Sequence, residues 1–275
     1  MLCFQGNIYC TLLCKLLDVK IIVRSNSAPD GWGQNLFKHF CFKYIFSFAD
    51  KIIVNRFEFK KKFKKRFNLK AICIYNPLDK KEIIRKSKIK SKISFNNNYL
   101  NIINVGRLTD QKDQITLLKA INEIKNILNF RLIIVGRGKE KKYLEKYILE
   151  KKLNKKVKII GFQKNPYSLI KSSDLFILTS LYEGLPNVLL EALTLKKFVI
   201  SSDCPTGPKE ILLNGRGGYL FKTKDYKGLS NLILNYSKNK KKLSNKIRMG
   251  YRNLDRFDFN KNIKRYYNEI NSLLY

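Results

Sequence analysis

Histidine is almost absent from this 275-residue sequence, in which His39 is the only one. Metal sites built on two or more histidines are therefore excluded. The six cysteines are scattered without the spacing of metal ligands, so we expect no metal site of any kind. Cys10 and Cys14 lie among leucines, which indicates buried thiols in a reducing cytoplasm.

Long apolar runs are missing as well. No uninterrupted run approaches the length that spans a bilayer. The N-terminal stretch "IYCTLLCKLL" is broken by Lys15 and lacks a basic leader and a small-residue cleavage site, so no signal peptide is predicted. With 44% hydrophobic residues, the chain still has enough apolar material for one large domain or two ordinary ones.

Acidic residues are few, 21 against 56 lysines and arginines, and the net charge is 56 − 21 = +35. Such a charge suits a polyanion, either nucleic acid or the anionic inner face of a membrane. Runs such as "KKKFKKRF" (60–67) and "KNKKKLSNK" (238–246) place apolar residues at helical spacing among the lysines. This pattern favours ordinary solvated helix faces over a nucleic acid partner. A basic nucleic-acid-binding protein stays as the remote alternative, and an anionic membrane surface stays open.

Short β-branched runs alternate with helical patterns along most of the chain. Buried parallel strands are predicted over 19–25, 51–54 and 71–75, with helices over 34–49 and 55–67. After a polar passage, further strands are predicted over 100–106, 130–136, 157–161, 174–180, 197–202 and 217–221, with helices over 113–128 and 139–152. This alternation predicts an α/β fold with two doubly wound parallel-sheet domains facing a cleft. The first domain, with about three strands, is expected to be incomplete.

The stretch "EGLPNVLLEAL" (183–193) places two glutamates eight positions apart. Glu183 follows the strand predicted over 174–180, and ligands of open α/β sheets bind at the carboxyl ends of strands. Pro186 suits the first position of the next helix, which puts Glu191 one to two turns inside that helix. Either these are a loop acid and a helix-surface acid with nothing in common, or they flank one pocket.

The helix start next to Glu183 predicts an anion site. The amides of Asn187 and Val188 would point into the same space, at the positive end of the helix dipole. Carboxylates accept hydrogen bonds from hydroxyls, whereas peptide amides suit phosphate oxygens. The combination therefore suits a sugar nucleotide.

A second strand end carries basic residues. In "VGRLTDQKD" (105–113), Arg107 and Lys112 follow a predicted strand, where they could neutralise a diphosphate leaving group without a metal. Glycine turns at Gly136 and Gly161 end two more strands on the same rim. Each glycine alone would indicate no more than a tight turn.

Taken in order, "NVGRLTDQKD", "LIIVGRGKE", "VKIIGFQ", "SDLFILTSLYEGLPNVLLEAL" and "VISSDCPTGPKEILLNGRGGYLF" resemble the donor-binding domain of retaining GT-B glycosyltransferases with the Glu-x7-Glu signature, glycosyl transferases group 1. "VKIIVRSNS" and "YNPLD" resemble the second half of that family's N-terminal domain. The resemblance implies four parts: a partial acceptor-side domain over 1–85, a linker over 86–99, a donor-binding domain over 100–256, and a crossover helix over 257–275.

The same resemblance implies roles for individual residues. Arg107 and Lys112 would hold the diphosphate and, with Glu183 beside the transferred sugar, make up the catalytic set. Glu191 would bind the ribose hydroxyls. Gly161 and Phe162 would border the nucleobase, and Gly136, Asn187 and Val188 would complete the donor site.

The activity implied is transfer of a sugar, with retention of configuration, from a nucleoside-diphosphate sugar to a hydroxyl of a glycan or polyprenyl-linked acceptor. A UDP-sugar is favoured over a GDP-sugar, and no cofactor, metal or nucleic acid partner is expected. The charge suggests a cytoplasmic enzyme, peripheral on the inner face of the cytoplasmic membrane. The aromatic stretch "LFKHFCFKYIFSF" (36–48) is first expected to be the core face of a helix, with a membrane-facing surface as the alternative.

Two departures from the family pattern stand out. The first strand–helix units of the N-terminal domain, with their glycine loop, have no counterpart, so the chain is expected to be N-terminally shortened. The loop in which the family often has a histidine reads "RSNSAPDGWG" (24–33), and His39 falls in a predicted helix as a structural residue. The alternative function is therefore a non-catalytic donor-binding remnant.

Overall fold

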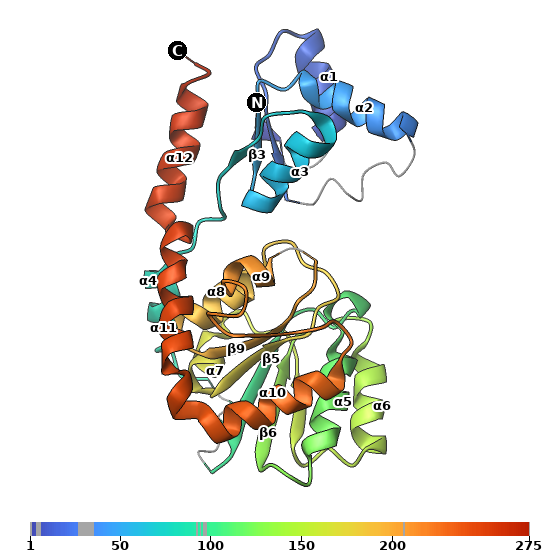
Figure 1. Cartoon of the computed structure of the whole chain (residues 1–275), viewed down its shortest axis with the longest axis vertical. Coiled ribbons are helices and arrows are strands. Elements are labelled where there is room, and N and C mark those ends of the chain that lie inside the picture. Colours follow the sequence, from blue (N-terminus) through green and yellow to red (C-terminus); the bar gives the residue numbers. More distant parts are fainter. Residues whose placement is uncertain are drawn as a thin grey trace. The chain divides into compact units, whose positions relative to one another are not determined.

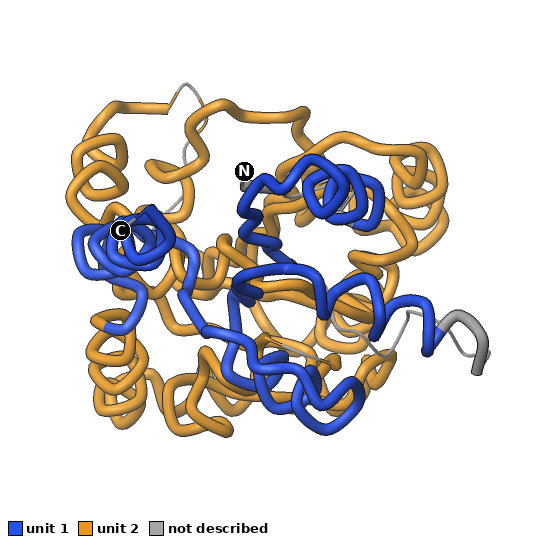
Figure 2. Tube along the Cα trace, turned by 90° about the horizontal axis from the view of Figure 1, so that it is seen from above, with its two compact units in different colours: residues 1–78, 256–275 blue, residues 79–255 orange. Residues whose placement is uncertain are grey.

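The structure is a computed structural model of the chain, and it describes residues 2–3, 7–26, 36–91, 93, 95, 98–205 and 207–274. The chain divides into two compact units, shown in Figure 2. Unit 1 comprises Met1–Leu78 and Arg256–Tyr275, and unit 2 comprises Asp79–Asp255. Within the described residues, none of the helices combines the length and the apolar character that crossing a bilayer requires.

Unit 1 contains a parallel sheet with the strand order β1-β2-β3-β4. Its strands are β1 (Leu2–Cys3), β2 (Ile22–Ser25), β3 (Lys51–Val54) and β4 (Ile72–Cys73). Its helices are α1 (Asn7–Leu16), α2 (Leu36–Ser47), α3 (Phe57–Phe67) and α12 (Phe259–Asn271). The three strands predicted here are confirmed, β3 with the predicted bounds and β2 and β4 with shorter ones, whereas β1 and α1 were not predicted.

Helices cover both faces of this sheet. Because the strand order follows the chain and crossovers are right-handed, α1, α2 and α3 lie on one face. There Phe46, Phe63 and Val54 share one core, with Cys14 buried among them as expected. On the other face, Tyr266 and Leu273 of the C-terminal segment pack over the sheet.

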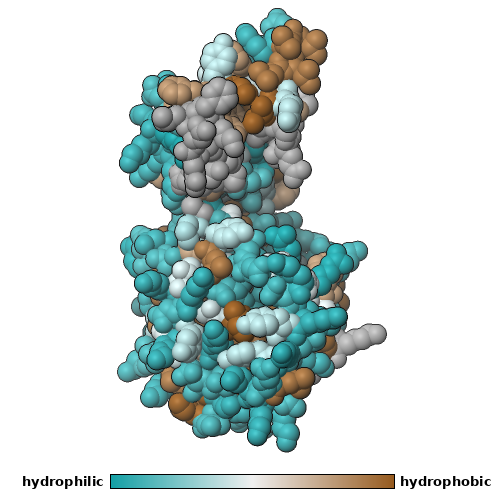
Figure 3. Space-filling view, turned by 90° about the vertical axis from the view of Figure 1, so that its right-hand side faces the viewer, coloured by the Kyte–Doolittle hydropathy of each residue, from teal (hydrophilic) through white to brown (hydrophobic). Residues whose placement is uncertain are grey.

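The aromatic stretch over 36–48 has some side chains in the core and others exposed to solvent. Phe42 and Phe46 of α2 pack into the core of unit 1, as a structural helix face would. Phe40 and Tyr44 are 63% and 66% exposed. Figure 3 shows apolar side chains gathered on part of unit 1, while most of the visible face of unit 2 is hydrophilic.

Unit 2 contains a six-stranded parallel sheet with the order β10-β9-β8-β5-β6-β7. Its strands are β5 (Leu100–Val105), β6 (Phe130–Val135), β7 (Val157–Ile160), β8 (Leu175–Leu178), β9 (Phe198–Ser202) and β10 (Tyr219–Phe221). All six lie within the predicted ranges. The central strands β8 and β9 are buried throughout, as expected for parallel strands covered on both sides.

Helices lie on both faces of this sheet (Figure 1). They are α4 (Lys80–Lys86), α5 (Gln114–Ile124), α6 (Lys141–Glu150), α7 (Tyr167–Ser172), α8 (Asn187–Thr194), α9 (Pro208–Ile211), α10 (Tyr226–Asn239) and α11 (Ser244–Arg252). The 3-10 turns are η2 (Asp110–Lys112), η3 (Lys240–Leu243) and η4 (Asn253–Phe257). Residues of α5, α6 and α10 share one core with the sheet. The helices α7 and α8 contact β5 and β9 respectively.

The short helix α4 was not predicted. Asp79 caps it by accepting a hydrogen bond from the Glu82 amide at 2.8 Å. The helix packs against α7 and α8, and Asn165 donates a hydrogen bond to the Lys86 carbonyl at 3.0 Å. Residues 79–85, placed in the first domain by sequence, therefore lie in unit 2. Between Lys86 and Leu100, the described residues form neither helix nor strand.

Candidate functional site

The strand order of unit 2 fixes where a ligand can bind. The chain leaves β5 toward β6 on one side and reaches β8 on the other, so β5 and β8 are neighbours at the switch point of the sheet. In doubly wound sheets the crevice at this point is the ligand site. The loops after β5 (106–113) and β8 (179–186) lie there, and they carry the basic pair and Glu183.

Lys112 and Glu183 form an ion pair at this switch point. Lys112 Nζ donates to Glu183 Oε1 at 2.5 Å, and the two side chains are only 14% and 6% exposed. Seventy-one positions separate them in the chain, and only the adjacency of β5 and β8 unites them. The predicted diphosphate contact and the predicted sugar contact thus lie side by side.

A buried polar layer holds this pair in place. Ser180 Oγ donates to Glu183 Oε1 at 2.6 Å, and Thr179 Oγ1 donates to the Lys112 carbonyl at 2.8 Å. Ser202, at the end of β9, donates to the Ser180 carbonyl at 2.6 Å. All three hydroxyl residues are fully buried. Their hydrogen bonds orient the carboxylate and the lysine before any ligand arrives.

Arg107 lies nearby but makes different contacts. Its guanidinium is exposed and donates to Gln111 Oε1 at 3.3 Å. Gln111 in turn donates to the Tyr182 carbonyl at 2.9 Å, and its own carbonyl accepts from the Leu181 amide at 2.8 Å. The loops after β5 and β8 are therefore joined through Gln111, and Arg107 stays at the surface, within reach of an incoming anion.

The turn after β6 approaches the turn after β5 very closely. A Cβ added to Gly136 would lie 1.8 Å from the Gly106 carbonyl oxygen, and one added to Gly138 would lie 2.1 Å from the Leu108 carbonyl oxygen. Only glycine permits this approach. The Leu108 amide donates to the Arg137 carbonyl at 2.9 Å, which ties the two turns together.

Gly161 and Phe162 follow β7 at the end of the same rim. A Cβ on Gly161 would meet nothing within 4 Å, so this position is open. Phe162 is 64% exposed, and the Arg137 guanidinium lies 5.4 Å from the centre of its ring. An exposed aromatic ring with a cation over it can stack on a flat heterocycle.

The helix after Glu183 begins one residue later than predicted. Pro186 is the N-cap residue, with φ −72° and ψ 93°, and Asn187 is the first helical residue. The extended ψ of Pro186 keeps it outside the helical turn. Asn187 is exposed and Val188 half-buried, so the first turn of α8 is accessible from solvent. The first amides of an α-helix have no carbonyl within the helix to donate to, and they favour anions.

Glu191 lies on α8, where it meets Tyr167 of α7. The Tyr167 hydroxyl donates to Glu191 Oε1 at 3.5 Å. Burial raises the pKa of Glu191 to about 7, against the lowering effect of that hydrogen bond. Burial and the neighbouring carboxylate raise the pKa of Tyr167 to about 12. The pKa of Glu191 therefore lies near neutral pH, and its carboxylate accepts a hydrogen bond from Tyr167.

Two other predictions concern His39 and metals. His39 lies in α2, its ring stacked on Phe67 with centroids 5.1 Å apart, which is the structural role expected for it. The loop over 27–33, compared above with a family histidine loop, lies outside the described residues. In the described part of the chain, no three His, Cys, Asp or Glu side chains gather as a metal site would require.

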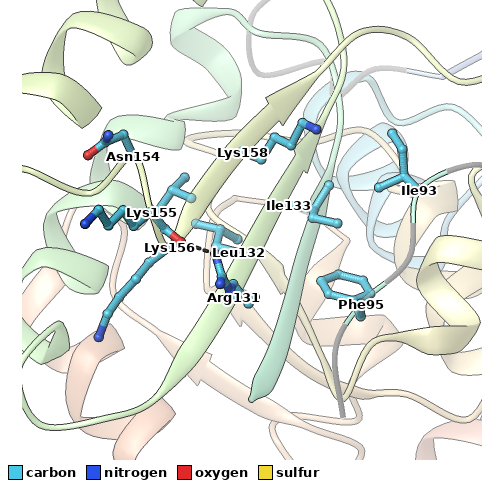
Figure 4. A pocket seen from close by; sticks show the side chains of 10 residues that line it. Ile93, Phe95, Arg131, Leu132, Ile133, Asn154, Lys155, Lys156 and Lys158 are labelled. Atoms are coloured by element: carbon cyan, nitrogen blue, oxygen red, sulfur yellow. Dashed lines mark hydrogen bonds between the residues drawn. The ribbon is translucent and has the colours of Figure 1, made fainter. Parts of the chain in front are cut away.

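A hollow of about 470 Å³ in unit 2 lies away from this site. It opens along the amino-terminal halves of β6 and β7, the opposite end of these strands from Gly136 and Gly161 (Figure 4). Arg131 donates to the Lys155 carbonyl and lies over the Tyr99 ring. The lysines around the hollow point in different directions rather than toward one another. Their arrangement does not build an anion site.

Six side chains of the site were not identified from sequence: Gln111, Arg137, Tyr167, Thr179, Ser180 and Ser202. The spacing of Ser180 three residues before Glu183 is a local signal, because a hydroxyl there can reach the carboxylate. Arg137 stands between two glycines in "VGRGK" and was overlooked. Tyr167 meets Glu191 only through the packing of α7 on α8, for which the sequence offers no signal.

Solved structures resemble the whole described fold. Anabaena HepE, in complex with UDP, aligns with a TM-score of 0.86 at 20% identity, covering 98% of this chain and 78% of that one. The lipopolysaccharide outer core galactosyltransferase WaaB in its apo form aligns with a TM-score of 0.74 at 20% identity, covering 98% of this chain and 75% of that one. These likenesses confirm the expected α/β GT-B fold with two parallel-sheet units.

Curated relatives match part of the chain. An uncharacterized glycosyltransferase of Methanocaldococcus jannaschii is 37% identical over 179 residues, which is 62% of this chain and 44% of the relative. The N-acetylgalactosamine-N,N'-diacetylbacillosaminyl-diphospho-undecaprenol 4-alpha-N-acetylgalactosaminyltransferase of Campylobacter jejuni is 33% identical over 153 residues, 55% of this chain and 40% of the relative. The lipopolysaccharide 1,6-galactosyltransferase of Escherichia coli is 28% identical over 169 residues, 59% of this chain and 45% of the relative. The chain thus spans less than half the length of these relatives.

The family model described as "Glycosyl transferases group 1" matches residues 85–253, more than half of the chain. This range contains every residue of the candidate site described above. It also agrees with the resemblance found in the ordered motifs of the sequence. The chain therefore belongs to the glycosyl transferases group 1 family.

Proposed function

We propose that unit 2 binds a nucleoside-diphosphate sugar, and that the protein transfers the sugar to a hydroxyl of a glycan or lipid-linked glycan. The observation that carries this proposal is the Lys112–Glu183 ion pair at the switch point of the sheet, beside the accessible first turn of α8. A buried lysine and helix amides suit phosphate oxygens, while a carboxylate suits sugar hydroxyls.

In this proposal each residue has a part in the reaction. Arg107 and Lys112 hold the diphosphate and stabilise the charge that develops as it leaves, without a metal. Glu183, held by Ser180, positions the transferred sugar. Glu191 accepts hydrogen bonds from the ribose hydroxyls, and the reaction retains the anomeric configuration.

The nucleobase would lie beyond Gly161. Phe162 and the Arg137 guanidinium offer a stacking surface there, and Gly161 leaves open space beside it. Gly136 would let the backbone approach the ligand, and the amides of Asn187 and Val188 would bind phosphate. A UDP-sugar is favoured over a GDP-sugar, because HepE was solved with UDP and with UDP-glucose.

Acceptor and location are inferred from the relatives' names and the charge. The relatives include transferases named for a diphospho-undecaprenol glycan and for lipopolysaccharide. With a net charge of +35, the protein would work in the cytoplasm, peripheral on the anionic inner face of the membrane, and without a nucleic acid partner.

Titration calorimetry of the whole chain with UDP, GDP and ADP tests the donor site. We expect a saturable heat of binding that is largest with UDP. If none of the three nucleotides gave a heat of binding, the proposal would be wrong. Transfer is tested separately by incubating the protein with UDP-sugars and lipid-linked glycans and assigning the new linkage by NMR. An inverted linkage would contradict retention.

The second candidate is donor binding without turnover. It is favoured by the family match to residues 85–253, the range that holds the candidate donor site. Heat with UDP but no product with any UDP-sugar and acceptor tested would support it over the transferase.

A further inference from the structure

A hollow of about 460 Å³ lies in unit 1, between α3 and the segment that leads into β4. This volume falls within the roughly 300–1,000 Å³ range of small-molecule sites. Its floor is apolar, formed by Phe57, Leu69, Ala71 and Ile72. Its remaining lining residues are all lysines, Lys60, Lys61, Lys64 and Lys70. We call it the α3 groove.

The sequence of α3 builds this groove. Phe59, Phe63 and Phe67 are at most 1% exposed and fix one side of the helix to the core. Phe57, Lys60, Lys61 and Lys64 recur at spacings of three and four, so they line a second side. Asn68, with φ 56°, ends the helix in the left-handed conformation and turns the chain back. Residues 69–72 then run beside the lysines.

The charge of the groove has one sign. No acidic residue lines it, and the nearest acid in sequence, Glu58, pairs with Lys62 at 3.2 Å. Lys61 Nζ lies 5.1 Å from the centre of the Phe57 ring, at the border between the apolar floor and the cations. Lysine stems extend apolar surface while their ammonium groups stay in water. The groove is therefore amphipathic, with an apolar floor and a cationic rim.

We propose that the α3 groove seats one anionic phospholipid of a bilayer, its phosphate among the lysines and the start of an acyl chain over Phe57, Leu69 and Ile72. A bilayer supplies both the apolar chain and the negative charge that the groove complements. Nucleic acid matches the cations but leaves the aliphatic floor uncovered. This docking is independent of the sugar transfer proposed above.

Charge-matched variants of the whole chain test the site. In the groove variant, Lys60, Lys61, Lys64 and Lys70 become Gln. In the control variant, four exposed lysines of unit 2 become Gln instead: Lys142, Lys227, Lys241 and Lys242. Both variants lose four charges. Co-sedimentation uses phosphatidylcholine vesicles with and without phosphatidylglycerol at one salt concentration.

The groove variant should lose at least about tenfold in partitioning to anionic vesicles, because each lysine near such a surface contributes about fivefold. The control variant should lose less than about threefold, since its lysines do not line the groove. Equal losses would show that net charge alone drives binding and would overturn the site. If the unchanged protein did not bind to anionic vesicles, the proposed site would also be overturned.

A second readout reports the acyl chain. The only tryptophan, Trp32, is replaced by Phe, and Phe57→Trp places a fluorophore on the groove floor. Lipids brominated along the acyl chain should quench this fluorescence in anionic vesicles, and lipids brominated only at the headgroup should quench it less. Absence of acyl-chain quenching in bound protein would contradict the groove and would point to another surface, such as the exposed Leu13 and Leu16 of α1.

Discussion

At the scale of single residues, the candidate site is organised around Lys112. Its ammonium is satisfied by Glu183 in the unliganded chain, with the Ser180 hydroxyl on the same carboxylate oxygen. A diphosphate bound as proposed would therefore have to share or take over a cation that is already paired. Because the pair is largely buried, its electrostatic interaction is stronger than that of a surface ion pair.

Lys112→Ala should weaken binding of the nucleoside diphosphate by about 1.5–3 kcal/mol, as expected for the loss of charge-assisted hydrogen bonds. Binding of the free nucleoside should change little, because it lacks the phosphates. Calorimetry with UDP and uridine measures both. An equal loss for the two ligands would mean that Lys112 supports the fold of the loop rather than the phosphates.

Replacement of Glu191 offers a test, because it should raise the stability of the fold at high pH and weaken the binding of UDP. Burial raises its pKa from 4.5 to about 7, so between these values the folded state binds more protons than the unfolded state. The stability that this group contributes is present at low pH and is lost as the pH rises through about 7. Above that pH, the buried carboxylate costs up to about 3 kcal/mol.

Glu191→Gln should therefore be more stable than the unchanged protein at pH 8, and the difference should vanish near pH 4.5. If Glu191 binds ribose hydroxyls, the same variant should bind UDP more weakly at pH 8. Thermal unfolding across the pH range and UDP titration measure the two effects. A variant that is neither stabilised at pH 8 nor weakened in binding would refute both roles.

At the scale of elements, the turns after β5 and β6 are locked together by glycine. Gly136→Ala would drive a Cβ against the Gly106 carbonyl, a backbone atom that cannot swing away. We expect a loss of about 2–4 kcal/mol in the free energy of unfolding. Gly161→Ala is the matched control, since nothing lies within 4 Å of its Cβ, and it should cost less than about 0.5 kcal/mol.

Urea denaturation of both glycine variants measures this difference. If Gly161 borders the nucleobase, as proposed, its variant should keep its stability while UDP binding weakens. Equal stability of the two variants would show that the backbone around Gly136 relaxes freely.

The elements also show how far sequence reasoning reaches. The six strands of unit 2 were predicted because each is a short β-branched or apolar run ending in glycine, serine or a polar loop. The helix α4 was missed because five of its seven residues are charged, and it is stabilised by the Asp79 cap and by packing on α7 and α8. The strand β1 is two residues long and leaves no periodicity to detect.

The site itself was predictable in part for the same reason. Arg107, Lys112 and Glu183 each follow a predicted strand, and parallel strands end at one edge of a sheet. The ion pair between Lys112 and Glu183 depends on which strands are neighbours, and the sequence does not specify the order β8-β5. The partner of Glu191, and its raised pKa, depend on tertiary burial by α7.

At the scale of the whole molecule, the charge of +35 governs association. We expect the protein to co-sediment with anionic vesicles at low salt, to be released at about 0.5 M salt, and to ignore neutral vesicles. The reason is that exposed charges are screened beyond roughly 10 Å at 0.1 M salt and more tightly above it. Binding that is indifferent to both salt and lipid charge would refute an electrostatic mechanism.

Unit 1 is assembled from the two ends of the chain, and this has a consequence for biosynthesis. On one face of its sheet, Ile22, Ile53 and Ile74 are covered by Tyr266 and Leu273. Lys51 of β3 also pairs with Glu269 of α12 at 2.7 Å. A ribosome makes the chain from the amino end at roughly 5–20 residues per second. Unit 2 has all of its residues once Asp255 has been added, whereas unit 1, begun first, acquires its second layer last. On the nascent chain, these three isoleucines therefore stay exposed until α12 has left the ribosomal exit tunnel. An exposed apolar surface of this kind is one that chaperones bind.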